Sequence, residues 1–207
     1  MSEMESIVAA IISVQTPHPV RVGIDGFCAS GKTTLADALA TALRAAGRRP
    51  VRVSADDFQN PPEIRWQLGS DSPEGFCRCQ LNYEALRTML LEPLGPGGNR
   101  KFRTTWFDVR RSELDVSPEF TADPTDVLLL DGLFLHAAPL DGCFDFTVFI
   151  SATFETCLQR ALDRNQEGVS SRAELEELYR VKYIPGFALY LSESRPTDRA
   201  SLVVPER

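Results

Sequence analysis

Runs of apolar residues alternate along the chain with amphipathic segments, and this alternation predicts a layered α/β protein. Short runs rich in Val, Ile and Leu, typical of buried strands, cover residues 20–24, 50–54, 127–130 and 146–150. Apolar residues at helical spacing predict helices over residues 4–14, 33–46, 82–91, 153–164 and 173–183. With a last edge strand at residues 201–204, we expect a doubly wound, mostly parallel five-stranded sheet with helices on both faces.

Two segments interrupt this pattern. Residues 59–79 contain three prolines and two glycines without a clear period, and they are expected to form an ordered functional loop or a lid. Residues 94–99 form a turn rich in Gly and Pro, and the basic stretch that follows, residues 100–111, carries three aromatic side chains. We therefore expect one domain, residues 1–207, with substrate-side loops at about 59–80 and 95–111.

The segment between the first predicted strand and helix carries the most specific motif of the chain. Residues 26–33 read Gly-Phe-Cys-Ala-Ser-Gly-Lys-Thr, a complete G-x-x-x-x-G-K-[ST] phosphate loop. Gly26 and Gly31 allow the backbone to turn tightly around an anion, Lys32 reaches the β- and γ-phosphates, and the Thr33 hydroxyl ligates Mg²⁺. The residues expected to contact the nucleotide are Gly26, Ala29, Ser30, Gly31, Lys32, Thr33 and Thr34. The motif thus predicts that ATP and Mg²⁺ are cofactors.

Composition narrows the range of partners. The net charge of −7 argues against a general nucleic-acid binder, which needs a basic face. No apolar run approaches the ~20 residues of a membrane-spanning helix. The five cysteines are an odd number and the first residues are acidic, so we expect reduced thiols in a cytoplasmic protein. The expected partners are ATP and a small-molecule acceptor, with a homodimer as a possible assembly.

Acidic residues follow two of the predicted strands at the edge where ligands bind in open α/β sheets. Asp131 ends the run Val-Leu-Leu-Leu and is a candidate for holding Mg²⁺ directly or through water; the alternative is a turn-capping aspartate. Asp56 and Asp57 follow the second strand, where a carboxylate can face the γ-phosphate opposite Lys32; the alternative is a helix N-cap. Arg160 and Arg164 share one helix face and suit a phosphate-holding lid, with a solvated charged face as the alternative.

Three stretches together resemble a known family. They are Gly23-Ile-Asp-Gly-Phe-Cys-Ala-Ser-Gly-Lys-Thr-Thr-Leu-Ala, Ser54-Ala-Asp-Asp-Phe and Leu130-Asp-Gly-Leu-Phe-Leu. This combination looks like the uridine kinase-like branch of the P-loop kinases, which also includes phosphoribulokinase, pantothenate kinase and nicotinamide riboside kinase. The segments beginning at Ser72, Leu90 and Arg180 resemble bacterial uridine kinases, so the resemblance covers nearly the whole chain.

The resemblance implies roles for individual residues. Asp56 would be the base that faces the acceptor hydroxyl, with Asp57 as the alternative. The helix with Arg160 and Arg164 would belong to a lid, at about residues 153–172, and contribute to catalysis with Lys32. The residues implied in acceptor binding are Asp57, Phe58, Phe107, Asp108 and Arg110. Uridine kinases usually carry a histidine shortly after the aspartate matched by Asp108, whereas this chain continues with Val, Arg and Arg, a difference that concerns pyrimidine recognition.

These observations favour an ATP-dependent kinase that phosphorylates a hydroxyl of a nucleoside-like acceptor. A sugar, a sugar phosphate, pantothenate and nicotinamide riboside are alternative acceptors, and the basic stretch at 100–111 would suit an anionic one. A GTPase switch requires an Asn-Lys-x-Asp tetrapeptide, which does not occur in the chain. A binding module without turnover has no need of the acceptor-side carboxylate at Asp56.

Overall fold

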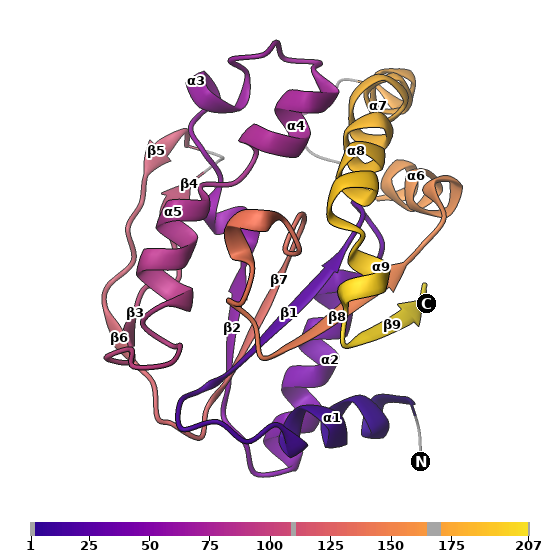
Figure 1. Ribbon diagram of the computed structural model, residues 1–207. Coiled ribbons are helices and arrows are strands. Elements are labelled where there is room, and N and C mark those ends of the chain that lie inside the picture. Colours follow the sequence, from indigo (N-terminus) through magenta and orange to yellow (C-terminus); the bar gives the residue numbers. More distant parts are fainter. Residues whose placement is uncertain (1–2, 109–110, 165–170, 207) are drawn as a thin grey trace.

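Five parallel strands form the centre of the protein, in the order β2-β7-β1-β8-β9 (Figure 1). The computed structural model describes residues 3–108, 111–164 and 171–206. The strands of the sheet are β1 (Val20–Gly26), β2 (Pro50–Ser54), β7 (Val127–Gly132), β8 (Phe146–Ser151) and β9 (Leu202–Pro205). The expected parallel α/β architecture is confirmed.

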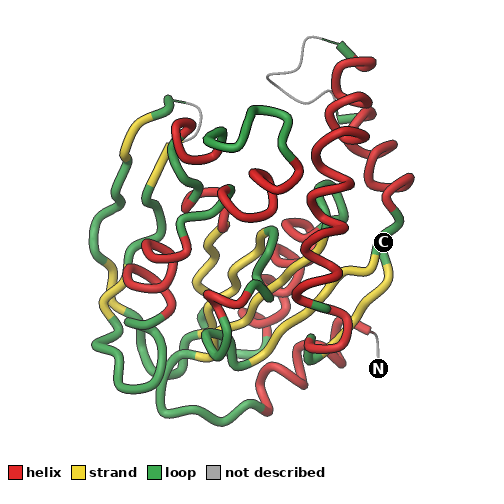
Figure 2. Tube along the Cα trace, turned by 45° about the horizontal axis from the view of Figure 1, so that its top comes forward, coloured by secondary structure: helices red, strands yellow, loops and turns green. Residues whose placement is uncertain are grey.

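Helices surround the sheet, as the tube view shows (Figure 2). The α-helices are α1 (Glu3–Ser13), α2 (Lys32–Ala45), α3 (Pro62–Arg65), α4 (Pro73–Cys79), α5 (Tyr83–Leu86), α6 (Phe154–Asp163), α7 (Arg172–Leu178), α8 (Ile184–Ser194) and α9 (Pro196–Arg199). The chain also forms 3₁₀ turns at Ala55–Phe58 and Ala138–Leu140 and π-helical turns at Arg87–Leu91 and Tyr179–Tyr183.

The alternation of side chains along β7 divides the core into two halves. Val127 and Leu129 pack with the buried residues of α1 and α2 on one face of the sheet. Leu128 and Leu130 pack on the other face with residues of α4, α5 and α8. Because every residue of β7 is buried, the strand reads as an unbroken apolar run in the sequence.

The segment at residues 59–79, expected to be an ordered functional loop or a lid, contains two short helices. Pro62 and Pro73 occupy the first turns of α3 and α4, where the missing N–H of proline costs no hydrogen bond. The Ser72 hydroxyl accepts a hydrogen bond from the Gly75 N–H and caps α4. The prolines therefore mark helix starts, which the absence of a clear period in the sequence did not indicate.

The helix expected at residues 173–183 continues much further than its sequence indicates. It passes from α7 through the π-helical turn into α8, which ends at Ser194. Pro185 and Gly186 disfavour a helix by propensity, yet the chain remains helical through both residues, directly after the π-helical turn. A Cβ at position 186 would lie 2.6 Å from the Pro73 carbonyl oxygen, so glycine permits α8 to pack closely against α4.

The basic stretch at residues 100–111 contributes two very short strands. β3 (Lys101–Phe102) pairs with β6 (Phe120–Thr121), and β4 (Phe107–Asp108) pairs with β5 (Glu113–Leu114), both antiparallel. Lys101 faces Glu119, and Arg103 donates to the Ser117 carbonyl oxygen, so these cations have partners within the chain. None of the helices in the described part of the chain is long and apolar enough to cross a membrane.

Candidate nucleotide and acceptor site

The phosphate loop adopts the strained turn that its glycines predict. It leaves β1 at Gly26 and enters α2 through Gly31, whose φ is +101°, a value that L side chains rarely adopt. At Gly26 (φ +154°), a Cβ would lie 2.9 Å from the Ser30 hydroxyl and 3.0 Å from the Ile150 carbonyl oxygen. The expected order of strand, loop and helix is present.

Several hydrogen-bond donors gather at this loop, and no side chain caps the start of α2. Because Gly31 precedes α2 and has no side chain, the first N–H groups of that helix point into the loop uncapped. The buried Ser30 hydroxyl makes no hydrogen bond to any described residue. The Lys32 ammonium group lies over the loop and donates to the Phe27 carbonyl oxygen at 2.8 Å. This arrangement of donors at a helix N-terminus fits a bound phosphate group.

Asp131 lies directly beside the loop, as its position at the end of β7 predicts. Its Oδ2 accepts a hydrogen bond from the Thr33 hydroxyl at 2.7 Å, and the residue is only 2% exposed. Its other oxygen, Oδ1, lies 2.9 Å from the Arg52 guanidinium. Arg52 was not expected to take part in the site, although it alternates with the buried residues of β2 and so points to a defined face.

A cavity of about 140 Å³ borders the loop on the side of β9. It is lined by Ser30, Gly31 and Thr34 of the loop, by apolar residues of α2 and β9, and by Arg160 and Arg164. One Arg160 guanidinium nitrogen lies 3.4 Å from the Ser30 carbonyl oxygen. The structure thus brings the two arginines to the phosphate loop, which the spacing along α6 alone could not show.

A second and larger cavity, of about 550 Å³, lies on the side of β2. It is lined by Asp56, Asp57, Gln59, Thr105, Phe107, Asp108 and Asp115. Four of these residues were expected there, namely Asp56 with Asp57 and the Phe107-Asp108 pair from a distant part of the chain. The hydrogen bond from the Trp106 N–H to the Asp57 carbonyl oxygen, at 2.8 Å, holds the two segments together. Gln59, Thr105 and Asp115 were missed because no motif marks them.

The carboxylates of this cavity differ in their surroundings. Asp56 Oδ1 accepts a hydrogen bond from the Gln59 amide at 3.2 Å, and Arg65 donates to the amide oxygen of Gln59 at 2.9 Å. Arg65 therefore orients the amide so that its NH₂ faces Asp56, which suits an ionised carboxylate. Burial raises the pKa of Asp57, with further contributions from Asp56, Asp131 and Asp108.

Two further residues were implied in acceptor binding, Phe58 and Arg110. Phe58 is completely buried in the core and does not line the larger cavity in the described structure, so it supports the cavity from the protein interior. Arg110 lies outside the described residues.

The donor set beside the loop fits magnesium. Mg²⁺ prefers oxygen ligands and is usually held by one or two carboxylates together with substrate phosphates and water. The Thr33 hydroxyl and the Asp131 carboxylate provide such oxygens at the point where a phosphate would lie. Among the residues that the structure describes, no group of three or more His, Cys, Asp or Glu could hold a metal ion without a substrate.

The cysteine within the phosphate loop should be chemically inert. Although Cys28 is only partly buried as a whole, the enclosure of its thiol raises the thiol pKa to about 12, an effect that Lys32 opposes. Since the thiolate is the reactive form, we expect iodoacetamide at pH 7.5 to modify Cys28 roughly 10²- to 10³-fold more slowly than glutathione. Mass spectrometry of the alkylated peptides measures this rate. Modification of Cys28 as fast as glutathione would contradict the enclosure of the thiol.

Comparisons with known proteins identify solved structures of similar fold. No model of a known protein family matches the chain. Among solved structures, a possible uridine kinase from Bacillus stearothermophilus is similar to this chain, with a TM-score of 0.76 and 20% sequence identity. The similarity covers 97% of this chain and 96% of that chain. A protein from a Silicibacter species, assigned as a fructose transport system kinase, shows 18% identity over 99% and 100% of the chains, with a TM-score of 0.75. The D-glycerate 3-kinase from Cryptococcus neoformans shows 16% identity over 93% and 86%, with a TM-score of 0.61.

These similarities extend over nearly the whole length of each chain. The expected resemblance to the uridine kinase-like P-loop kinases is therefore confirmed at the level of the fold. The names of the similar proteins refer to chemically different acceptors on one fold, so the acceptor of this chain has to be argued from its own residues.

Proposed function

We propose that the protein is an ATP-dependent kinase that transfers the γ-phosphoryl group to a hydroxyl of a small, nucleoside-like acceptor. The observation that carries this proposal is the presence of two cavities, one lined in part by the phosphate loop and the other by residues that follow β2 together with residues from the 105–115 segment. One is bordered by Arg160 and Arg164, and the other by the carboxylates Asp56 and Asp57. A module that only binds or hydrolyses a nucleotide needs the first cavity and not the second.

The nucleotide side uses groups that are already directed at the loop. The N–H groups at the start of α2, the Ser30 hydroxyl and Lys32 would bind the β- and γ-phosphates. The apolar residues of the smaller cavity would contact the base, while Arg160 and Arg164 would stabilise the charge that spreads over the transferring group. Positioning and charge neutralisation supply most of the catalysis in such reactions.

The acceptor side would orient a hydroxyl group and remove its proton. Asp56 is the proposed base: Gln59 holds its Oδ1, which leaves Oδ2 for the acceptor hydroxyl. The hydroxyl oxygen forms the new bond to phosphorus as the bond from phosphorus to the ADP oxygen breaks, and the hydroxyl proton passes to Asp56. Asp57, Phe107 and Asp108 would bind the remainder of the acceptor.

Magnesium would be held by the Thr33 hydroxyl, with Asp131 supporting it directly or through water. When bound, the ion neutralises the phosphate oxygens. Burial, and to a lesser degree the neighbouring carboxylates, raise the pKa of Asp57, so a cation bound near this carboxyl group would favour its ionised form.

The basic stretch gives little support to an anionic acceptor. Lys101 and Arg103 have partners of their own on the β3–β6 side, and Arg111 lies next to Asp108 and Glu113. A screen of nucleosides, sugars, sugar phosphates and pantothenate with coupled detection of ADP release tests the proposal. Acceptor-dependent ADP release supports a kinase, whereas release that no acceptor stimulates would favour a nucleotide hydrolase.

The role of Asp131 can be separated from its ion pair with Arg52. The Asp131→Asn variant should fold and should need about 10- to 100-fold more Mg²⁺ for half-maximal MgATP binding, because it loses the charge that supports the metal. Asp37→Asn is the matched control, since exposed Asp37 also pairs with Arg52, at 3.1 Å, from the outer surface. Calorimetric titration of ATP binding at increasing Mg²⁺ measures both variants. An unchanged Mg²⁺ requirement in Asp131→Asn would leave that residue only a structural role.

A further inference from the structure

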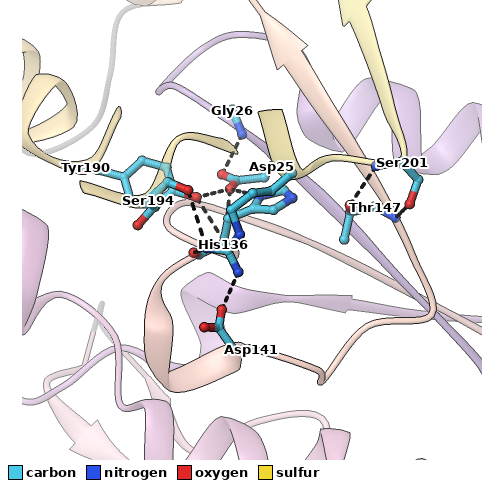
Figure 3. A network of polar contacts seen from close by, with 9 residues as sticks. Asp25, Gly26, His136, Asp141, Thr147, Tyr190, Ser194 and Ser201 are labelled. Atoms are coloured by element: carbon cyan, nitrogen blue, oxygen red, sulfur yellow. Dashed lines mark hydrogen bonds and ion pairs between the residues drawn. The ribbon is translucent and has the colours of Figure 1, made fainter. Parts of the chain in front are cut away.

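A buried carboxylate to which the sequence motifs assign no role lies directly before the phosphate loop. Asp25 is the residue of β1 that precedes Gly26, and its exposed fraction is 0%. Figure 3 shows Asp25 at the centre of a polar network with His136, from the segment after β7, and Tyr190, from α8. Sequence analysis left all three residues unassigned.

Both carboxylate oxygens of Asp25 accept hydrogen bonds, and their donors come from different parts of the chain. Oδ1 accepts a hydrogen bond from the Gly26 N–H at 2.7 Å. Oδ2 accepts from the Tyr190 hydroxyl, from the His136 ring at 2.8 Å and from the His136 N–H at 3.3 Å. Hydrogen bonds that stabilise a buried carboxylate are stronger than neutral ones, so the network fixes the position of Asp25 firmly.

The bond to Gly26 controls where the phosphate loop begins. The Gly26 N–H points at Asp25 and is therefore withdrawn from the anion site. The following residue, Phe27, places its carbonyl oxygen against Lys32 and its ring 4.9 Å from the Phe187 ring of α8. A shift of the Asp25 carboxylate would thus move the first peptide of the loop relative to Lys32 and the start of α2.

Helix α8 connects this anchor to the acceptor side. Tyr190 extends from α8 to Asp25, and the same helix packs against α4, which lies in the substrate-side segment. Arg199 extends the network further, because it donates to the His136 carbonyl oxygen at 2.7 Å and pairs with Asp141. The loop is consequently held by a helix that also packs against α4.

We propose that Asp25 and Tyr190 are positioning residues for the nucleotide: they fix the Gly26 peptide and thereby preorganise the phosphate loop for MgATP. This inference rests on the proposed nucleotide binding and concerns residues that touch neither nucleotide nor acceptor. Preorganisation raises affinity because the loop does not have to be ordered when the ligand binds.

The Tyr190→Phe variant tests the proposal, and the chain offers a matched control. Tyr179 is also completely buried in the aromatic cluster and contacts Phe27, but its hydroxyl has no hydrogen-bond partner among the described residues. We expect Tyr190→Phe to weaken MgATP binding about 3- to 10-fold and Asp25→Asn to weaken it more, since single hydrogen bonds to charged groups have this order of effect. Tyr179→Phe should keep the wild-type affinity within about twofold.

Two readouts separate positioning from a purely structural role. Affinity is measured by calorimetry well below the melting temperature of each variant, so that only folded protein is compared. The Gly26 amide resonance, observed by NMR in ¹⁵N-labelled protein, should shift in Tyr190→Phe and Asp25→Asn but not in Tyr179→Phe. A lower melting temperature with wild-type MgATP affinity in Tyr190→Phe would overturn the proposal.

Failure of the proposed function has a different signature. In that case the wild-type protein itself would show no affinity for MgATP, and Lys32→Ala would change nothing; the positioning role would then be rejected together with the nucleotide site. Suppose that the wild-type protein binds MgATP and the Lys32→Ala variant does not. If Tyr190→Phe and Asp25→Asn then bind MgATP with wild-type affinity, only the positioning role is rejected.

Discussion

Replacing Lys32 by alanine is expected to lower the rate of phosphoryl transfer by about 10³-fold or more. Lys32 is the cation of the phosphate loop, and its ammonium group is the group proposed to follow the negative charge on the β- and γ-phosphates. Removal of a single preorganised donor to a developing charge already costs about 10²- to 10³-fold in kcat. Here the same substitution also removes a full positive charge.

The fold should tolerate this change. The loss for the free protein is one hydrogen bond to the Phe27 carbonyl oxygen, which contributes about 1 kcal/mol to the free energy of unfolding. Lys101→Ala serves as the control, because it removes an exposed lysine that faces Glu119 away from the site. The measurements are ADP release with the acceptor found by the screen and the melting temperature of each variant. Wild-type turnover in Lys32→Ala would refute the assignment of the loop.

Replacing Asp56 by asparagine should give the second large loss, about 10²- to 10⁴-fold in kcat, with little change in ATP affinity. Asparagine keeps the size of the side chain and can still accept the hydrogen bond from Gln59, but it has no basicity. Asp56 is exposed to the larger cavity and not to the nucleotide side, so MgATP should bind as in the wild type. Steady-state kinetics and calorimetry separate the two quantities.

The neighbouring Asp57 provides the comparison. Burial and three nearby carboxylates raise the pKa of Asp57, which makes this group sensitive to any cation bound beside Asp131. We therefore expect Asp57→Asn to alter acceptor KM and Mg²⁺ dependence more than kcat. If Asp57→Asn loses kcat while Asp56→Asn keeps it, the base is Asp57.

Local patterns predicted the layers of the fold because they depend on near neighbours in the chain. The fully apolar run of β7 predicted a strand covered on both faces, and the helical spacing of residues 33–46 predicted α2. The same reasoning failed where tertiary contacts outweighed propensity. One such case is α8, which continues through Pro185 and Gly186 and packs closely against α4 at that glycine. Helices α3 and α4 were missed for another reason: their prolines stand in the first turn, where proline is compatible with a helix.

The candidate site likewise has one part that local patterns predicted and another part that they did not. Its phosphate loop could be predicted completely, because the spacing of Gly26, Gly31, Lys32 and Thr33 itself specifies the local backbone. The lining of the acceptor cavity could be predicted only in part. Asp56 and Phe107 are far apart in the sequence, and the Trp106–Asp57 hydrogen bond that joins their segments leaves no periodic signal.

By itself, the sequence determined that this protein is a parallel α/β domain with a phosphate loop and acidic strand ends. Only the tertiary structure decided what the buried polar residues do. Asp25 and Tyr190 are separated by most of the chain, and each alone is compatible with an ordinary core position. The two residues meet because α8 packs over the end of β1. A buried carboxylate in a low-dielectric interior requires hydrogen-bond donors, and the neighbouring segments of the fold supply them to Asp25.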